Sequence, residues 1–192
     1  INNSYKYKTI QSFIKSYSYK NKSPLIYSSY EVERLETGGG IKNALHLFKK
    51  DYILAINADS LLINFGNICP VKQLYNSFDK KNMSILMLLA PIKNSIGYKG
   101  KGDFVMKSKK LASEIKRKKS NAEFGLVFTG WQIIRKDLFN AIKKKNFSLN
   151  LLYDLAAKKK NLYGIKLNGN FLHASTPKSL IQIENYININ KN

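Results

Sequence analysis

An acidic residue directly after a short apolar run has the position and chemistry of a ligand for a phosphate-bound metal ion. The run 52–56 is rich in aliphatic residues, which predicts a buried parallel strand, and Asn57 and Asp59 follow its carboxyl end. Ligands of open α/β sheets bind outside the carboxyl ends of the strands. Asp59 is therefore a candidate ligand for Mg²⁺ on a nucleoside triphosphate. The alternative, equally compatible with the strand alone, is that Asp59 caps the following loop.

Three consecutive glycines, residues 38–40, precede a helix-like run over residues 41–48. Glycine admits positive φ and lets another group approach the backbone closely, so a glycine triplet suggests a binding loop. We expect Thr37 to cap the helix with its hydroxyl, which would leave the N–H groups of the first turn free for phosphate or for a base edge. The alternative is a plain turn that enters a helix.

Two later stretches also place glycine beside polar side chains. Gly102 and Asp103 end a glycine-rich loop that begins at Gly97, and a hairpin with strands 104–107 and 111–116 is predicted after it. These glycines either serve the turn alone or bring the loop to the sugar or phosphate of a second substrate. Thr129 and Gly130 interrupt a strand predicted over 123–134, where a glycine indicates a bulge or the close approach of a ligand.

The elements that must position these residues alternate between strands and helices. Periodicity and turn residues predict strands at 25–27, 52–56, 83–90, 162–167 and 171–172, and helices at 7–19, 41–48, 71–78, 137–142, 148–157 and 176–189. This alternation predicts right-handed crossovers, a doubly wound and mainly parallel sheet, and a single domain over residues 1–192.

Composition limits the classes of partner. The 192 residues carry a net charge of +21, which by itself suggests nucleic acid or an anionic surface. The excess is mostly lysine and is scattered along the chain, as codon use in an AT-rich genome would produce, so nucleic acid is not the expected partner. The longest apolar run, 83–92, is shorter than the about 20 residues of a membrane span. One cysteine, Cys69, excludes an internal disulfide and predicts a cytoplasmic location.

Five short motifs, in this order, resemble those of the nucleotidyltransferase family that makes nucleoside-diphosphate sugars. Within that family the chain looks most like bacterial N-acetylmuramate-1-phosphate uridylyltransferases and their mannose-1-phosphate guanylyltransferase-like relatives. The resemblance implies a Rossmann-like three-layer α/β/α fold with a mainly parallel sheet. The motifs are Leu-Glu-Thr-Gly-Gly-Gly-Ile at 35–41, Asn-Ala-Asp at 57–59, Gly-Asp-Phe at 102–104, Phe-Thr-Gly at 128–130 and Thr-Pro at 176–177.

The resemblance also implies a reaction. A sugar-1-phosphate oxygen attacks the α-phosphorus of UTP or GTP, pyrophosphate leaves, and Mg²⁺ offsets the developing charge. By similarity, Asp59 is the catalytic residue and the metal ligand. The implied nucleotide-binding residues are Thr37, Gly38, Gly39 and Asn57, and those implied on the sugar-phosphate side are Gly102, Asp103, Thr129, Gly130 and His173.

The chain departs from the family pattern at two places. Family members open with a glycine-rich Gly-x-Gly-x-Arg-Met loop and a Pro-Lys-Pro segment that cradle the triphosphate, and neither occurs in this sequence. We therefore expect an N-terminal truncation of about two βα units, and the alternative function is an inactive remnant or the C-terminal piece of a split enzyme that works beside a separate N-terminal fragment.

The second departure is at the metal site that the resemblance implies. His173 stands where many members carry an aspartate as second metal ligand, and Ser175 replaces the glycine of the following turn. A neutral imidazole is a poorer Mg²⁺ ligand than a carboxylate, so His173 is expected to bond a phosphate or to be structural. His46 is expected to be structural.

Overall fold

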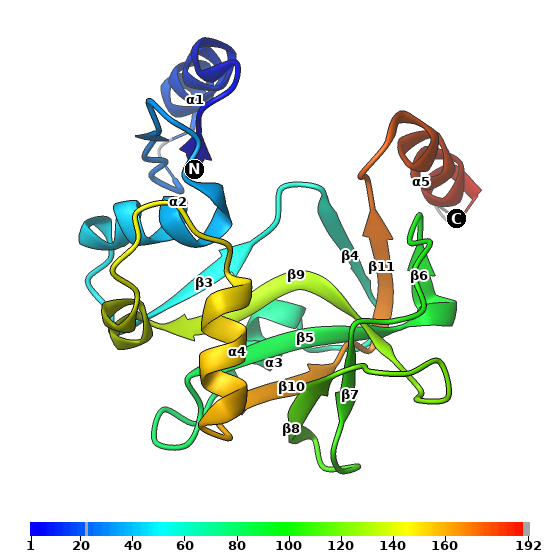
Figure 1. Cartoon of the computed structure of the whole chain (residues 1–192). Helices are drawn as coiled ribbons and strands as arrows, with labels where there is room; N and C mark the ends of the chain where they lie inside the picture. The colour runs from blue at the N-terminus through cyan, green and yellow to red at the C-terminus, as the bar shows by residue number, and fades with distance from the viewer. Residues whose placement is uncertain (22, 190–192) are drawn as a thin grey trace. The chain divides into compact units, whose positions relative to one another are not determined.

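The computed structural model describes residues 1–21 and 23–189, which form two compact units (Figure 1). The first unit combines Ile1–Asp51 with Lys136–Asp154, and the second combines Tyr52–Arg135 with Leu155–Asn192. Each unit has its own strands and buried residues, and each is described separately below. The single domain over residues 1–192 stays a prediction.

The first unit is mostly helical. Strand β1 (Asn2–Asn3) pairs in parallel with β2 (Ser29–Tyr30), so the strand predicted at 25–27 is wrong by a few residues. Helix α1 (Tyr7–Lys20) confirms the predicted helix and buries Ile14. The remaining elements are helix α2 (Glu36–Ala44), the 3₁₀ helices Leu45–Leu47 and Lys136–Ala141, and the start of helix α4 (Asn150–Lys158).

A six-stranded sheet dominates the second unit (Figure 1). Its order is β3 (Tyr52–Ile56), β9 (Leu126–Arg135), β5 (Ile85–Pro91), β10 (Leu162–Lys166), β8 (Ala112–Arg117) and β7 (Phe104–Met106). Strand β7 also pairs with β9, which closes the last five strands of this order into a barrel.

The mainly parallel sheet expected from the sequence is wrong. Strand β9 runs antiparallel to both of its neighbours, β3 and β5, because the chain returns between them instead of crossing over through a helix. Within the described residues, β5 and β10 are the one parallel pair of this sheet. The fold is therefore mixed α/β.

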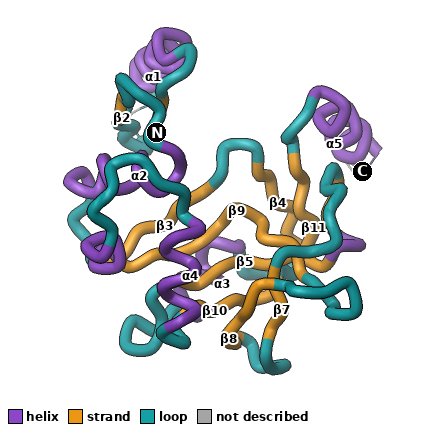
Figure 2. Tube along the Cα trace, in the orientation of Figure 1, coloured by secondary structure: helices purple, strands orange, loops and turns teal. Residues whose placement is uncertain are grey.

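A smaller sheet completes the second unit. Strand β11 (Gly169–His173) lies between β4 (Ser60–Asn64), which is antiparallel to it, and β6 (Ser95–Ile96), which is parallel. The sequence does not predict strand β4, because the polar residues 57–60 are typical of the end of a strand and here form a turn between two strands. The predicted hairpin is confirmed by β7 and β8 (Figure 2). Helices α3 (Pro70–Ser77) and α5 (Pro177–Ile189) and the 3₁₀ helix Ile92–Asn94 belong to the same unit.

Strand β5 is the centre of the core of the second unit. All six residues from Ile85 to Ala90 have no exposed surface, and burying one aliphatic side chain of this size stabilises a fold by about 1.5–3 kcal/mol. On the neighbouring strand β10, a Cβ at Gly164 would lie 2.7 Å from Leu89 and 2.8 Å from Ile115, so a larger residue does not fit there. In residues 1–21 and 23–189, no helix combines the length and the apolarity that crossing a bilayer requires.

Candidate active site

The turn between β3 and β4 carries the predicted residues Asn57 and Asp59. The Asn57 N–H donates to the Gly130 carbonyl (3.1 Å), and the Ser60 N–H donates back to the Asn57 carbonyl (3.2 Å). On its other side, the turn is held by the Ala174 N–H, which donates to the Asp59 carbonyl (2.9 Å). The turn is therefore fixed by hydrogen bonds to the segments that follow β11 and that interrupt β9.

Asp59 and His173 face each other at the end of this turn. The pairing of β4 with β11 places Ser60 opposite His173, so Asp59 is next to the histidine. The distance from Asp59 Oδ2 to His173 Nε2 is 3.4 Å, and the side chains are 44% and 30% exposed, respectively. The imidazole stacks on the ring of Phe171, with centroids 5.6 Å apart and planes 25° apart. The two side chains thus form an ordered pair that solvent and a ligand can reach.

Thr129 and Gly130 form a bulge in β9 beside this pair. The register between β5 and β9 shifts between Met87 and Leu89, which confirms the irregularity that the strand glycine predicted. The Thr129 hydroxyl donates to the Leu88 carbonyl (2.9 Å), and the Ser60 hydroxyl donates to the Thr129 carbonyl. Gly130 has φ of 81°, and a Cβ on it would lie 2.7 Å from the Asn57 Cβ.

The structure therefore brings five of the predicted site residues together. Bonds between the β3–β4 turn, the bulge of β9 and the end of β11 join them. These residues are Asn57, Asp59, Thr129, Gly130 and His173.

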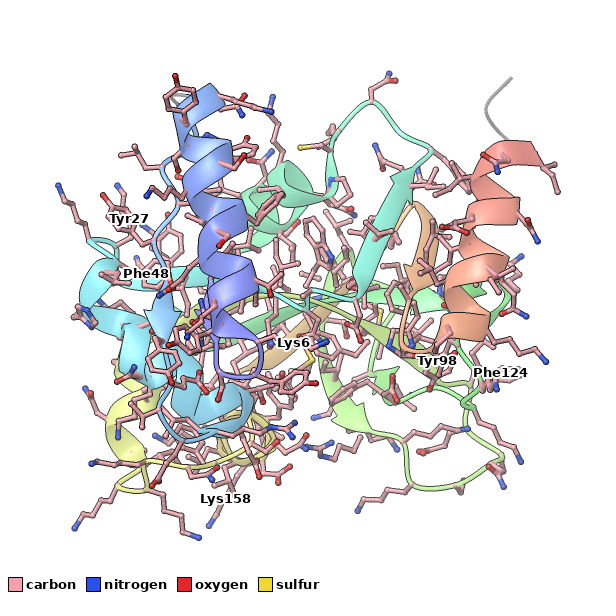
Figure 3. All side chains as sticks on the ribbon, turned by 90° about the horizontal axis from the view of Figure 1, so that it is seen from above. Lys6, Tyr27, Phe48, Tyr98, Phe124 and Lys158 are labelled. Atoms are coloured by element: carbon pink, nitrogen blue, oxygen red, sulfur yellow. The ribbon has the colours of Figure 1, made fainter. Side chains whose placement is uncertain are left out.

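Gly102 and Asp103 lie where the loop before β7 joins β9, in the same unit. Asp103 Oδ1 accepts a hydrogen bond from the Tyr98 hydroxyl (3.1 Å), and Oδ2 accepts one from the Phe128 N–H (2.8 Å). The Gly102 N–H donates to the Tyr98 oxygen (3.1 Å). Burial, followed by the charge and hydrogen bond of Asp103, raises the pKa of Tyr98 to about 12. The carboxylate of Asp103 thus fastens the Tyr98 loop to β9. The side chain of Tyr98 is labelled in Figure 3.

The glycine triplet belongs to the first unit and differs from the expected loop. Helix α2 begins at Glu36, Leu35 is its N-cap residue and no side chain caps it, so the expected Thr37 cap is wrong. Instead, the Thr37 hydroxyl accepts the Leu149 N–H (3.3 Å).

The first-turn N–H groups are also not free as expected. Gly38 and Gly39 both donate to the Phe147 carbonyl, at 2.9 and 3.0 Å. Cβ atoms at these glycines would lie 2.5 Å from the Phe147 ring and 2.1 Å from the Lys145 carbonyl oxygen. The close approach that the glycines permit is therefore, in this structure, the approach of the chain's own segment 145–147. The nucleotide role of Thr37, Gly38 and Gly39 stays a prediction.

Sequence reasoning missed three residues that shape the site. Ser60 bonds the bulge, Tyr98 bonds Asp103, and Phe171 orients His173. The sequence signal for Phe171 was its spacing, because residues two apart on a strand lie on one face. The Ser60 contact joins segments 69 residues apart, which no local pattern indicates. Tyr98 is only five residues from Asp103, but the glycine-rich loop between them has no regular periodicity that would indicate the contact.

The donor set fits a hard or borderline cation bound with few protein ligands. Within residues 1–21 and 23–189, no cluster of three or more His, Cys, Asp or Glu side chains could hold a metal ion. Asp59 and His173 supply one carboxylate and one imidazole. Mg²⁺ in phosphate-transfer sites is commonly held by one or two carboxylates plus substrate phosphates, so a single exposed carboxylate is compatible with it.

The chain was compared with proteins of known function, and it is similar in sequence to one of them. It is 25% identical over 176 residues to N-acetylmuramate alpha-1-phosphate uridylyltransferase of Caulobacter vibrioides, an alignment that covers 91% of this chain and 71% of that protein. The chain resembles the sugar-phosphate nucleotidyltransferases. This confirms the resemblance inferred from the five motifs, although no protein-family model matches the chain.

Solved structures show that the resemblance extends to the fold. The crystal structure of HddC from Yersinia pseudotuberculosis superposes with a TM-score of 0.69 at 20% identity, over 96% of this chain and 76% of HddC. A UDP-glucose pyrophosphorylase complexed with UDP-glucose superposes with a TM-score of 0.68 at 16% identity, over 98% of this chain and 74% of that one. HddC has also been solved in complex with GMP-PN.

Proposed function

We propose that this protein is a sugar-1-phosphate nucleotidyltransferase, which transfers a nucleoside monophosphate from UTP or GTP to a sugar-1-phosphate and releases pyrophosphate. The observation that carries the proposal is that contacts within the second unit join Asp59, His173 and the Thr129–Gly130 bulge. The fold and the sequence similarity to a sugar-1-phosphate uridylyltransferase support it.

In this proposal the chain positions its substrates and offsets their charge. Asp59 would hold Mg²⁺, and the ion would supply the positive charge that a triphosphate needs as pyrophosphate leaves. Asn57 lies against Gly130, and these two residues would contact the nucleotide and the sugar phosphate, respectively. Bonds from Asn57 and Ser60 to the bulge hold the two binding sides in register.

Asp103 is proposed to act by positioning. Both of its carboxylate oxygens accept hydrogen bonds from within the chain, so it would shape the sugar-phosphate side by holding Gly102 and the Tyr98 loop against β9. On the family resemblance alone, Thr37, Gly38 and Gly39 are proposed as nucleotide-binding residues. A cytoplasmic location is part of the proposal, because nucleoside triphosphates are made there.

The test is pyrophosphate release from UTP or GTP with Mg²⁺ and a panel of sugar-1-phosphates. It is run on the chain alone and on the chain supplied with the glycine-rich N-terminal loop that the family resemblance predicts. Turnover in either form supports the proposal. A folded protein that is inactive in both forms would establish the alternative, an inactive remnant.

The same assay on the Asp59→Asn variant tests whether turnover depends on the proposed site. Removal of the carboxylate charge is expected to lower turnover roughly 100-fold or more, because electrostatic stabilisation is the main contribution of the protein to phosphate transfer. Asp51→Asn is the matched control, because Asp51 is exposed in the first unit and its substitution changes the net charge by the same amount. Wild-type turnover in Asp59→Asn would remove Asp59 from the mechanism.

A further inference from the structure

We propose that Asp59 and His173 jointly bind one first-row transition-metal ion, such as Co²⁺, more tightly than Mg²⁺. The inference builds on the proposed function, since the ion would serve the same triphosphate. In the proposed site, the protein supplies one oxygen ligand and one nitrogen ligand, whereas a typical Mg²⁺ site has oxygen ligands alone.

The distance between the two donor atoms suits a shared ion. Two ligand atoms bound at about 2.1 Å, with roughly 90–110° between the bonds, lie roughly 3.0–3.4 Å apart. Asp59 Oδ2 and His173 Nε2 are separated by 3.4 Å. A charge-assisted hydrogen bond is shorter, at about 2.7–2.9 Å. The separation is at the upper end of this range and longer than a charge-assisted hydrogen bond, so it accommodates two ligands of one cation.

Both ligands are held in place before any ion binds. The register of β4 with β11 and the bond from the Ala174 N–H to the Asp59 carbonyl (2.9 Å) fix the two backbones. The stack on Phe171, which is only 2% exposed, fixes the plane of the imidazole. Partial exposure of Asp59 and His173 leaves room for water and phosphate oxygens to complete the coordination.

The chemistry of the imidazole decides which ion is preferred. Mg²⁺ strongly prefers hard oxygen ligands, whereas imidazole nitrogen suits later first-row ions, with affinity rising from Mn²⁺ to Co²⁺ and Ni²⁺. A site with oxygen ligands alone would lose this advantage over Mg²⁺. His173 thus discriminates between ions, and Asp59 supplies the negative charge that either ion requires.

The first experiment uses the fact that the chain has two histidines. In ¹⁵N-resolved NMR spectra of the imidazoles, sub-stoichiometric Co²⁺ is expected to shift or broaden the signals of His173 and to leave those of His46 unchanged. His46 is an exposed internal control whose Nδ1 lies 2.9 Å from the Asn43 carbonyl oxygen. His46→Gln assigns the two sets of signals. If Co²⁺ affects neither histidine, or both equally, the proposal is wrong.

The second experiment measures selectivity by competition between Co²⁺ and Mg²⁺, without substrates. Wild-type protein is expected to prefer Co²⁺ by roughly 10-fold or more, and His173→Gln is expected to lose most of that preference. His173→Asp should raise Mg²⁺ affinity while lowering Co²⁺ affinity, because it restores a pair of carboxylates. Circular dichroism confirms that each variant is folded. Equal affinities in wild type, or a His173→Gln variant with the wild-type ratio, would overturn the proposal.

The outcome can be separated from that of the proposed function. Ion binding is read without nucleotide or sugar, so a chain that binds Co²⁺ at His173 but releases no pyrophosphate keeps the cation site and loses the enzymatic function. A chain that turns over with Mg²⁺, while Co²⁺ leaves the His173 signals unchanged, keeps the function and loses this site.

Discussion

Gly130 illustrates how much a single residue determines at the site. Its φ of 81° lies in the left-handed region, and a Cβ on it would be 2.7 Å from the Asn57 Cβ. Any other residue would strain the bulge and push Asn57 away. The glycine therefore couples the geometry of β9 to the turn that carries Asp59.

Gly130→Ala is expected to destabilise the protein by about 1–3 kcal/mol and to lower turnover, because it adds both backbone strain and a steric clash. Urea denaturation and pyrophosphate release measure the two effects. Gly66→Ala is the control, since the nearest atom to its added Cβ is the Asn168 side-chain nitrogen at 3.0 Å. Equal stability of the two variants would show that the bulge tolerates a side chain.

Tyr98 provides a pH-dependent signature of the loop before β7. Its pKa is raised from 10.0 to about 12, so the folded state holds the phenol proton more tightly than the unfolded state does. The contribution to stability is present below pH 10 and is lost as the pH rises towards 12. Tyr98→Phe should therefore show a smaller decrease in unfolding free energy across this range, as measured by denaturation at each pH. Parallel curves for the two proteins would contradict the assigned environment.

In helix α2, replacement of a glycine by alanine is expected to have the opposite effect on stability from that usual in helices. Replacing an exposed helix glycine by alanine ordinarily stabilises a helix by about 1 kcal/mol. Here the added Cβ at Gly39 would meet the Lys145 carbonyl oxygen at 2.1 Å. The close packing of segment 145–147 against the helix thus offsets the low helix propensity of the glycines.

Gly39→Ala is therefore expected to destabilise the first unit by about 1–3 kcal/mol, as overpacking of a close contact does. Thermal unfolding would measure the loss of stability, and hydrogen exchange of the α2 amides would locate it in the helix. Asn43→Ala, at an exposed position of the same helix, should instead raise stability slightly. If Gly39→Ala stabilises the protein as Asn43→Ala does, the packing against Lys145 is not tight.

Elements with strong local patterns could be predicted, and those set by distant contacts could not. The strand at 52–56 and the 104–116 hairpin are predictable because a short apolar run and turn residues are local signals, and both elements are observed. The antiparallel position of β9 between β3 and β5 depends on pairing across the chain, which no local pattern encodes.

The site could be predicted in the same uneven way. The positions of Asp59 at a strand end and of Gly130 inside a strand predict both residues as site candidates, but no sequence pattern predicts the contacts of Ser60 and Tyr98. Buried N–H groups at Gly38 and Gly39 could not be foreseen, because their acceptor is more than a hundred residues away.

The charge of the whole molecule predicts a dependence on salt. A net charge of +21 destabilises the folded chain through self-repulsion, and raising ionic strength from roughly 0.01 to 0.15 M shortens the Debye length from about 30 to 8 Å. The unfolding temperature is therefore expected to rise by about 2–4 °C or more in NaCl over this range. KCl at matched ionic strength should give the same shift. A temperature that stays constant would show that local ion pairs already offset the repulsion.

The closure of the barrel also bears on how the chain folds. Strand β5 has its parallel partner in β10, and this pairing joins Ile85 to Leu162, which are far apart in the sequence. Pairing over such a separation has a large loop-closure cost and slows folding into the range of milliseconds to seconds. During synthesis, the fully apolar strand β5 is made long before β10 leaves the ribosome. Until then only β9, on the other edge of β5, can pair with it. The nascent protein therefore passes through a stage in which its most hydrophobic strand lacks its parallel partner, and this is the stage at which chaperones would be needed.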